Sequence, residues 1–81
     1  MAVLRLFASA REAAGTARAT VAGATVGEVL AVARRRYGDG FTAVLAGCRV
    51  WVNGEAATDD TPVGDDDEVA VLPPVSGGQV R

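Results

Sequence analysis

Glu68-Val-Ala-Val-Leu-Pro-Pro-Val-Ser-Gly-Gly78 is the stretch that decides the fold. Its first five residues form a short run rich in strand formers, which predicts the last strand of a sheet. Two prolines then end the strand, because each fixes φ and lacks a backbone N–H donor. The closing diglycine has no Cβ atoms, so it can pass through a channel too narrow for side chains. A restricted diproline followed by a diglycine without side chains suits delivery of a carboxylate at Gly78 into another protein. The alternative interpretation is a frayed terminus.

The amino-terminal part of the chain predicts two strands and a short helix. Residues 2–8 are rich in strand formers and too few for a solitary helix, and residues 17–21 alternate in polarity. Between the two strands, Ser9 can cap a short helix over residues 10–14. Gly15 is expected to stop that helix in the left-handed conformation.

A capping box predicts the start of the main helix. The Thr25 hydroxyl can accept the amide three residues on, while the Glu28 side chain reaches back to the cap. Gly38 is expected to end the helix, and residues 34–36, all arginine, fall in its last turn, as a solvated helix end or a docking patch. The expected buried stripe consists of Val26, Val29, Leu30, Ala33 and Tyr37.

The remaining strands are marked by a hairpin signal. After a turn or short helix over residues 41–46, residues 48–53 alternate as a strand, and Asn53-Gly54 favours a type I′ turn before residues 55–57 pair back. The acidic run 65–67 is interpreted as a solvated turn and not as a metal site. With the last strand pairing beside the first, the sequence predicts an α+β fold with one mixed sheet of about five strands, one main helix and short extra helices.

Composition limits what the chain can do alone. It has 81 residues, net charge −2 and no histidine, so we expect a single domain over residues 1–72, no catalytic or metal-ligand cluster, and no nucleic-acid partner. The absence of a charged leader and of a long apolar run predicts a cytoplasmic protein without a membrane segment. The lone Cys48 agrees with that location. We interpret it as a buried inert thiol; a persulfide-carrying role is the alternative.

Strand alternation predicts an apolar docking surface. If the leucines of the first strand and the valines of the third face the helix, then Phe7 and Trp51 face away from it, and Leu72 is out of phase with the valines of its own strand. These three residues would form an exposed patch of the kind that marks a partner interface. The alternatives are a covering loop or a register displaced by one residue.

Several of these motifs together resemble one known family over residues 2–78. The start Phe7-Ala-Ser-Ala-Arg-Glu12, the Val52-Asn53-Gly54 hairpin, the Asp67-Glu68-Val69 strand start and the Pro73-Pro-Val-Ser-Gly-Gly78 end are similar to those of ubiquitin-like β-grasp sulfur carriers, closest to the small subunit of molybdopterin synthase. Other diglycine carriers serve thiamine and cysteine synthesis. The resemblance implies a β-grasp fold and a carrier that is not an enzyme on its own.

The resemblance also implies partners and site residues. An adenylating enzyme related to ubiquitin-activating enzymes would use ATP to activate Gly78, and a persulfide donor would then convert it to a thiocarboxylate. The large catalytic subunit would accept the tail and pass the sulfur to a cyclic pterin precursor of molybdopterin. No permanently bound cofactor is implied. The residues implied to thread into that subunit are Pro73, Pro74, Val75, Ser76 and Gly77.

One feature departs from the family pattern. The chain continues through residues 79–81, so Gly78 carries an amide where adenylation needs a carboxylate. We therefore expect a tail of residues 73–78 followed by an extension that a protease removes. Two alternatives remain open: a carrier of sulfur to another metabolite, such as a siderophore, cysteine or thiamine, or a ubiquitin-like binding module or protein modifier that carries no sulfur.

Overall fold

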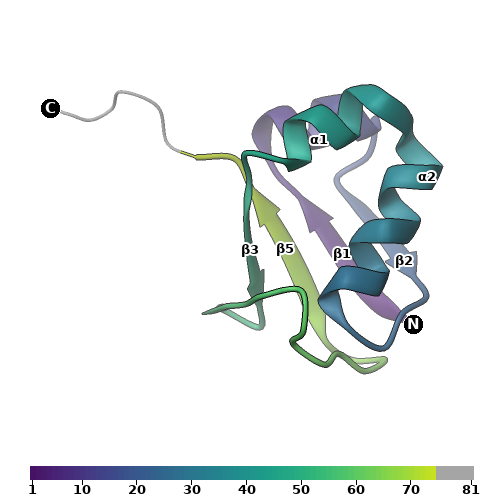
Figure 1. The fold of residues 1–81 in the computed structure, drawn as a ribbon, viewed down its shortest axis with the longest axis vertical. Helices are drawn as coiled ribbons and strands as arrows, with labels where there is room; N and C mark the ends of the chain where they lie inside the picture. The colour runs from purple at the N-terminus through teal and green to yellow at the C-terminus, as the bar shows by residue number, and fades with distance from the viewer. Residues whose placement is uncertain (75–81) are drawn as a thin grey trace, which may run out of the picture.

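The computed structural model describes residues 1–74 as a five-stranded mixed sheet with its helices on one face (Figure 1). The sheet order is β2-β1-β5-β3-β4; β1 and β5 run parallel, and the other neighbours are antiparallel. This confirms the predicted α+β architecture. The elements are β1 (Ala2–Leu6), α1 (Ala8–Ala14), β2 (Arg18–Val21), α2 (Val26–Leu45), β3 (Arg49–Val52), β4 (Glu55–Ala56) and β5 (Glu68–Leu72).

Strand β5 lies at the centre of the sheet and matches its predicted bounds. It pairs with β1 on one side and with β3 on the other, as predicted for the last strand beside the first. Val69 and Val71 are fully buried against the helices, while Leu72 is exposed. Burial of each such valine contributes about 1.5–3 kcal/mol. Alternation along β5 therefore fixes which face meets the core and which stays free.

The capping box at the start of α2 is confirmed. The Glu28 amide donates to Thr25 Oγ1 at 3.2 Å, and Glu28 Oε1 accepts the Ala24 amide at 2.7 Å, one residue before the cap. At Gly38 the helix is interrupted by a non-helical conformation (φ 87°, ψ −167°), and a second helical segment then runs to Leu45. The predicted stop is thus a kink, and the predicted short helix over 41–46 follows directly from it. The predicted buried stripe is fully buried except for the half-buried Tyr37.

The prediction that Ser9 caps the first helix is wrong. Helix α1 begins at Ala8, and the cap position belongs to Phe7, with no side-chain cap hydrogen bond. The Phe7 carbonyl instead accepts the amides of Ala10 (3.1 Å) and Arg11 (3.4 Å), so the backbone starts this helix. Strand β1 ends earlier than predicted because Ala8 has a positive φ of 51°. Gly15 takes the predicted left-handed conformation.

The β3–β4 turn is the predicted Asn53-Gly54 hairpin, with φ of 51° and 87° at its two positions. The Asp67 carboxylate binds this turn: it accepts Asn53 Nδ2 at 2.9 Å and the Gly64 amide at 2.8 Å. Asn53 Oδ1 in return accepts the Glu68 amide at 2.9 Å. Both hydrogen bonds stabilise the ionised carboxylate and lower the pKa of Asp67, and the bond from the Gly64 amide has the larger effect. The acidic run thus includes a carboxylate that joins the start of β5 to the hairpin.

Over residues 1–74, no helix is both long and apolar enough to cross a membrane. In the same residues, no three His, Cys, Asp or Glu side chains gather into a group that could hold a metal ion.

Candidate functional site: the helix-free face of the sheet

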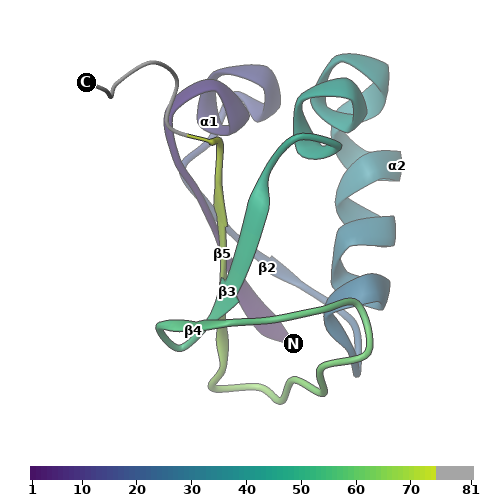
Figure 2. The same cartoon turned by 60° about the vertical axis from the view of Figure 1, so that its left-hand side comes forward.

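The candidate site lies on the face of the sheet that no helix covers (Figure 2). The register of β1, β5 and β3 pairs Leu6 with Val71 and Leu72 with Arg49. Phe7 follows Leu6 and Leu72 follows Val71, so in this parallel pair Phe7 is beside Leu72. Directly opposed residues share a face of the sheet, and Phe7, Leu72 and Arg49 therefore lie in one row. The Phe7 amide donates to the Val71 carbonyl at 3.3 Å, which holds it beside the end of β5.

Two of the three predicted patch residues are exposed. Phe7 is 37% and Leu72 is 36% exposed, as strand alternation predicted. Trp51 is half-buried and opposes Ala70 one row away on the same face. It lines a groove of about 410 Å³ together with Arg49, Leu72, Pro73 and Pro74. The face thus offers exposed apolar groups beside an open groove, while its role in partner binding stays a prediction.

Charged side chains accompany this apolar patch. The Arg5 guanidinium lies over the Phe7 ring at 5.4 Å and is 3.3 Å from a Glu68 carboxylate oxygen. Arg49 is exposed where β3 begins. These arginines were not among the predicted site residues. Alternation already put them on the outward face, but their place beside Phe7 and Leu72 follows from the pairing register.

The groove lies where the tail leaves the sheet. Pro73 and Pro74 follow β5 directly and form part of its wall. Because both lack an amide hydrogen, neither can extend the ladder of β5. The other predicted tail residues, Val75, Ser76, Gly77 and Gly78, lie outside the described residues. The threading role of residues 73–77 and the reactive role of Gly78 stay predictions.

Cys48 has the surroundings of a structural thiol. It is half-buried before β3, and its Sγ donates to the Val44 carbonyl at 3.2 Å. Burial raises its pKa, so little of it is thiolate at neutral pH. These surroundings fit the inert-thiol interpretation and count against a persulfide-carrying role. The hollow of about 320 Å³ beside it is lined by Cys48, Arg49, Val50, Trp51, Ala56, Ala57 and Asp59.

The sheet order, the helix across one face and the exit of the tail from the central strand define a ubiquitin-like β-grasp protein of the sulfur-carrier type. The chain belongs to the ThiS family, whose family model matches residues 4–78. That match covers the predicted diglycine and agrees with the resemblance noted in the sequence.

Three solved structures are similar over nearly the whole chain. The small archaeal modifier protein 1 from Methanosarcina acetivorans is 29% identical, with 95% of each chain covered and a TM-score of 0.85. A putative molybdopterin converting factor subunit 1 from Pyrococcus furiosus is 26% identical, covering 91% of this chain and 97% of that one, with a TM-score of 0.80. A chain of the BexX/CysO complex from Amycolatopsis orientalis is 25% identical, covering 96% and 100%, with a TM-score of 0.78.

Proposed function

We propose that this chain carries sulfur as a thiocarboxylate on Gly78 and donates it to a cyclic pterin precursor of molybdopterin. The observation that carries the proposal is the family match, which extends through Gly77 and ends at Gly78. The similarity to a molybdopterin converting factor subunit supports the pterin as acceptor. In this role the chain is the sulfur-donating subunit of a heteromeric sulfurtransferase and has no catalytic side chain of its own.

The chemistry explains why a carboxyl terminus is needed. A carboxylate is a poor electrophile, so the adenylating enzyme joins the Gly78 carboxylate to the α-phosphorus of ATP and releases pyrophosphate. The outer sulfur of a persulfide donor then attacks the carbonyl carbon and displaces AMP, which gives an acyl disulfide with the donor. A second thiol on the donor cleaves the S–S bond, so the thiocarboxylate is released and the donor is left with a disulfide. The resulting thiocarboxylate is ionised at neutral pH and is a soft nucleophile. A folded domain attached to it supplies recognition, which lowers the entropic cost of bringing the sulfur to the pterin.

The same proposal requires a processing step. In the chain as written, the Gly78 carbonyl belongs to the peptide bond with Gln79. A protease therefore has to remove residues 79–81 before ATP can be used. We propose no permanently bound cofactor, since ATP belongs to the activating partner.

A second candidate function is protein modification. The similarity to a small archaeal modifier protein favours it, because a diglycine carboxylate activated in the same way can be transferred to an amine of a target. Delivery of sulfur to a metabolite other than the pterin is a further variant, favoured by the similarity to a chain of the BexX/CysO complex. All three share the activation of Gly78 and differ in the acceptor.

The test starts from three forms of the chain: full-length, ending at Gly78, and ending at residue 78 with Gly78→Ala. Each is incubated with the adenylating enzyme from the same cells, ATP and a persulfide donor, and its intact mass is measured. We expect only the form ending at Gly78 to exchange one oxygen for sulfur with high yield. An unchanged mass for that form would overturn the carrier proposal.

The acceptor is tested separately. The thiocarboxylate form is mixed with the large synthase subunit and the cyclic pterin, and the dithiolene product is measured. Formation of the product with return of the Gly78 carboxylate supports the pterin as acceptor. Isopeptide conjugates to target lysines in cell extract, without pterin conversion, would favour the modifier.

A further inference from the structure

Strand β2 forms the longer of the two edges of the sheet in residues 1–74. The sheet order places β2 at one edge and β4 at the other, and β4 has only two residues against four in β2. An edge strand presents backbone N–H and C=O groups that can pair with a strand of another molecule. Short length and the exposed charge of Glu55 protect the β4 edge. The β2 edge therefore needs protection of another kind.

The β1–β2 register shows which backbone groups of β2 point away from the sheet. The Leu6 amide donates to the Ala17 carbonyl at 2.9 Å, so the Ala17 carbonyl points toward β1. Along an antiparallel strand, residues that bond to the neighbouring strand alternate with residues whose polar backbone groups point to the other side. The N–H and C=O groups of Arg18 and Thr20 therefore point outward, where a second strand could bind them.

Two side chains of the chain itself occupy these outward groups. Thr16 Oγ1 donates to the Arg18 carbonyl at 3.0 Å and accepts the Arg18 amide at 3.4 Å. Arg36 Nη1 donates to the Thr20 carbonyl at 3.3 Å. Thr16 lies just before β2 in the sequence, whereas Arg36 reaches the strand from α2. A partner strand would have to displace both side chains before it could pair with β2.

Positive charge adds to this protection. The Arg36 guanidinium lies at the Thr20 carbonyl, and Arg18 is exposed on the same strand. Arg18 also faces Arg5 across the β1–β2 register. If two copies paired antiparallel along β2, the Arg18 and Arg36 side chains of both copies would come close together. Like charges on paired strands repel each other, so charge and hydrogen bonding oppose the same contact.

We infer that Thr16 and Arg36 close the β2 edge against strand addition by a second copy of this chain. Without these two side chains the edge is self-complementary, because an antiparallel pair centred on Ala19 matches the outward groups of Arg18 with those of Thr20 in the other copy. Arg36 belongs to the arginine run of α2, for which the sequence predicted a solvated helix end or a docking patch. The inference gives it a different role, edge protection, and does not rest on the proposed function.

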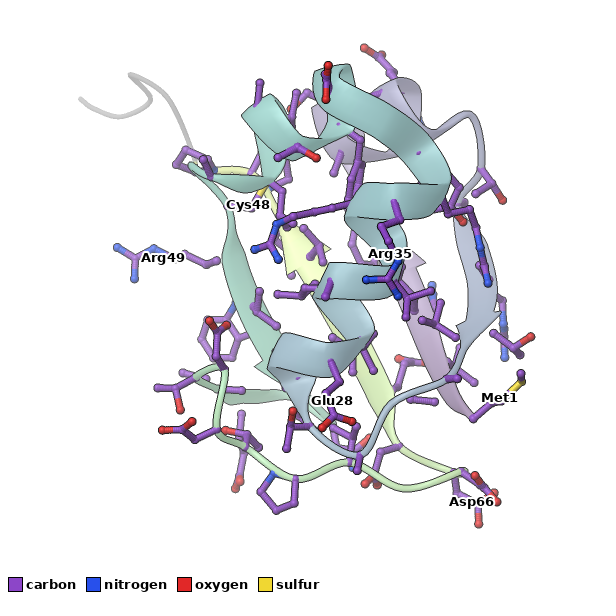
Figure 3. All side chains as sticks on the ribbon, turned by 45° about the vertical axis from the view of Figure 1, so that its right-hand side comes forward. Met1, Glu28, Arg35, Cys48, Arg49 and Asp66 are labelled. Atoms are coloured by element: carbon purple, nitrogen blue, oxygen red, sulfur yellow. The ribbon has the colours of Figure 1, made fainter. Side chains whose placement is uncertain are left out.

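The test removes both side-chain contacts from the full-length chain and measures self-association. Thr16→Val deletes the hydroxyl at nearly constant volume, and Arg36→Ala deletes the guanidinium from an exposed helix position. The control variant carries the same two changes elsewhere, as Thr58→Val and Arg35→Ala. Thr58 is exposed in the loop after β4, on the opposite side of the sheet, and Arg35 is exposed on α2, with the sheet behind the helix (Figure 3).

Sedimentation equilibrium over about 10 μM to about 1 mM protein gives the dimer dissociation constant of each form. We expect the wild type and the control variant to stay monomeric over this range. The dimer dissociation constant of the Thr16→Val, Arg36→Ala variant should be at least about tenfold lower than that of the wild type. Arg36→Ala alone should shift it in the same direction by less, and it provides the test if the double variant fails to fold.

Amide hydrogen exchange shows whether such a dimer forms through β2. Because the Thr20 N–H points outward, its exchange should become slower with rising protein concentration in the double variant, and not in the wild type or the control. A double variant that is folded and stays monomeric would overturn the inference. So would equal dimerisation of the two double variants, or a dimer in which exchange at Thr20 is unchanged. A wild-type dimer with slowed exchange at Thr20 would also overturn it, because the edge would then be open.

Discussion

Replacing Phe7 by serine should weaken partner binding much more than it weakens the fold. The side chain is 37% exposed, which corresponds to about 75 Å² when roughly 200 Å² is taken for a whole phenylalanine. At about 25 cal/mol per Å², full burial of that area in an interface contributes about 1.9 kcal/mol, or about 20-fold in the dissociation constant. Loss of the contact with the Arg5 guanidinium costs the folded chain only about 0.5–1 kcal/mol.

The assay is a titration of the adenylating enzyme with the full-length chain, alongside urea unfolding of each variant. Phe7→Leu is the matched control, because it keeps most of the apolar area and should bind within about threefold of the wild type. A Phe7→Ser chain that is folded and binds as tightly as the wild type would refute the assignment of Phe7 to the interface. Weak binding by both variants would mean that the aromatic ring itself, and not its area, is recognised.

The remaining predictions concern the fold and its titrating groups. Gly23→Ala should destabilise the chain by about 1–3 kcal/mol, because an added Cβ would lie 2.9 Å from Val29 Cγ2 at a φ of 157°. Gly40→Ala, with no atom within 4 Å of the added Cβ, should stabilise the chain by about 0.5–1 kcal/mol. Urea midpoints equal to that of the wild type would contradict both predictions. Folding lowers the pKa of Asp67. Its contribution to the free energy of unfolding is therefore complete above the ordinary pKa of about 3.9 and is lost as the pH falls through the folded pKa. The free energy of unfolding should accordingly fall less steeply with decreasing pH in Asp67→Asn than in the wild type. Iodoacetamide should modify Cys48 more slowly than free cysteine at about pH 8; an equal or faster rate, measured by mass, would reopen the persulfide role.

The elements that could be predicted from the sequence are those that short-range rules determine. The Asn53-Gly54 turn needs positive φ at two adjacent positions, and the capping box joins Thr25 to a residue three positions on. The bounds of β5 follow from its valines and from the prolines after it. Exposure of Phe7 and Leu72 follows from alternation, since the residue before each, Leu6 and Val71, is almost fully or fully buried.

The features that could not be predicted depend on which of several adjacent residues starts or resumes a helix, or on the pairing register across the sheet. Ser9 has the right chemistry for a cap, but the left-handed Ala8 starts the helix one residue earlier and leaves the Phe7 carbonyl as acceptor. At Gly38 the sequence shows that the helix breaks but not that it resumes, which depends on burial of Phe41. The opposition of Arg5 and Arg18 depends on register, and a shift of one residue would turn each side chain to the other face.

One strand connects the core, the docking face and the reactive end. Val69 and Val71 are fully buried and hold β5 in the middle of the sheet, and Leu72 directly follows Val71 in this anchored strand. Gly78 is six residues beyond Leu72 in the sequence, which limits its distance from Leu72 to about 20 Å even for a fully extended chain. A partner that binds Phe7 and Leu72 must therefore place its reacting atoms within that radius. Because β5 is anchored at Leu72, binding energy gained on the sheet face can be used to position the carboxyl end, and the tail needs no recognition side chains at its glycines.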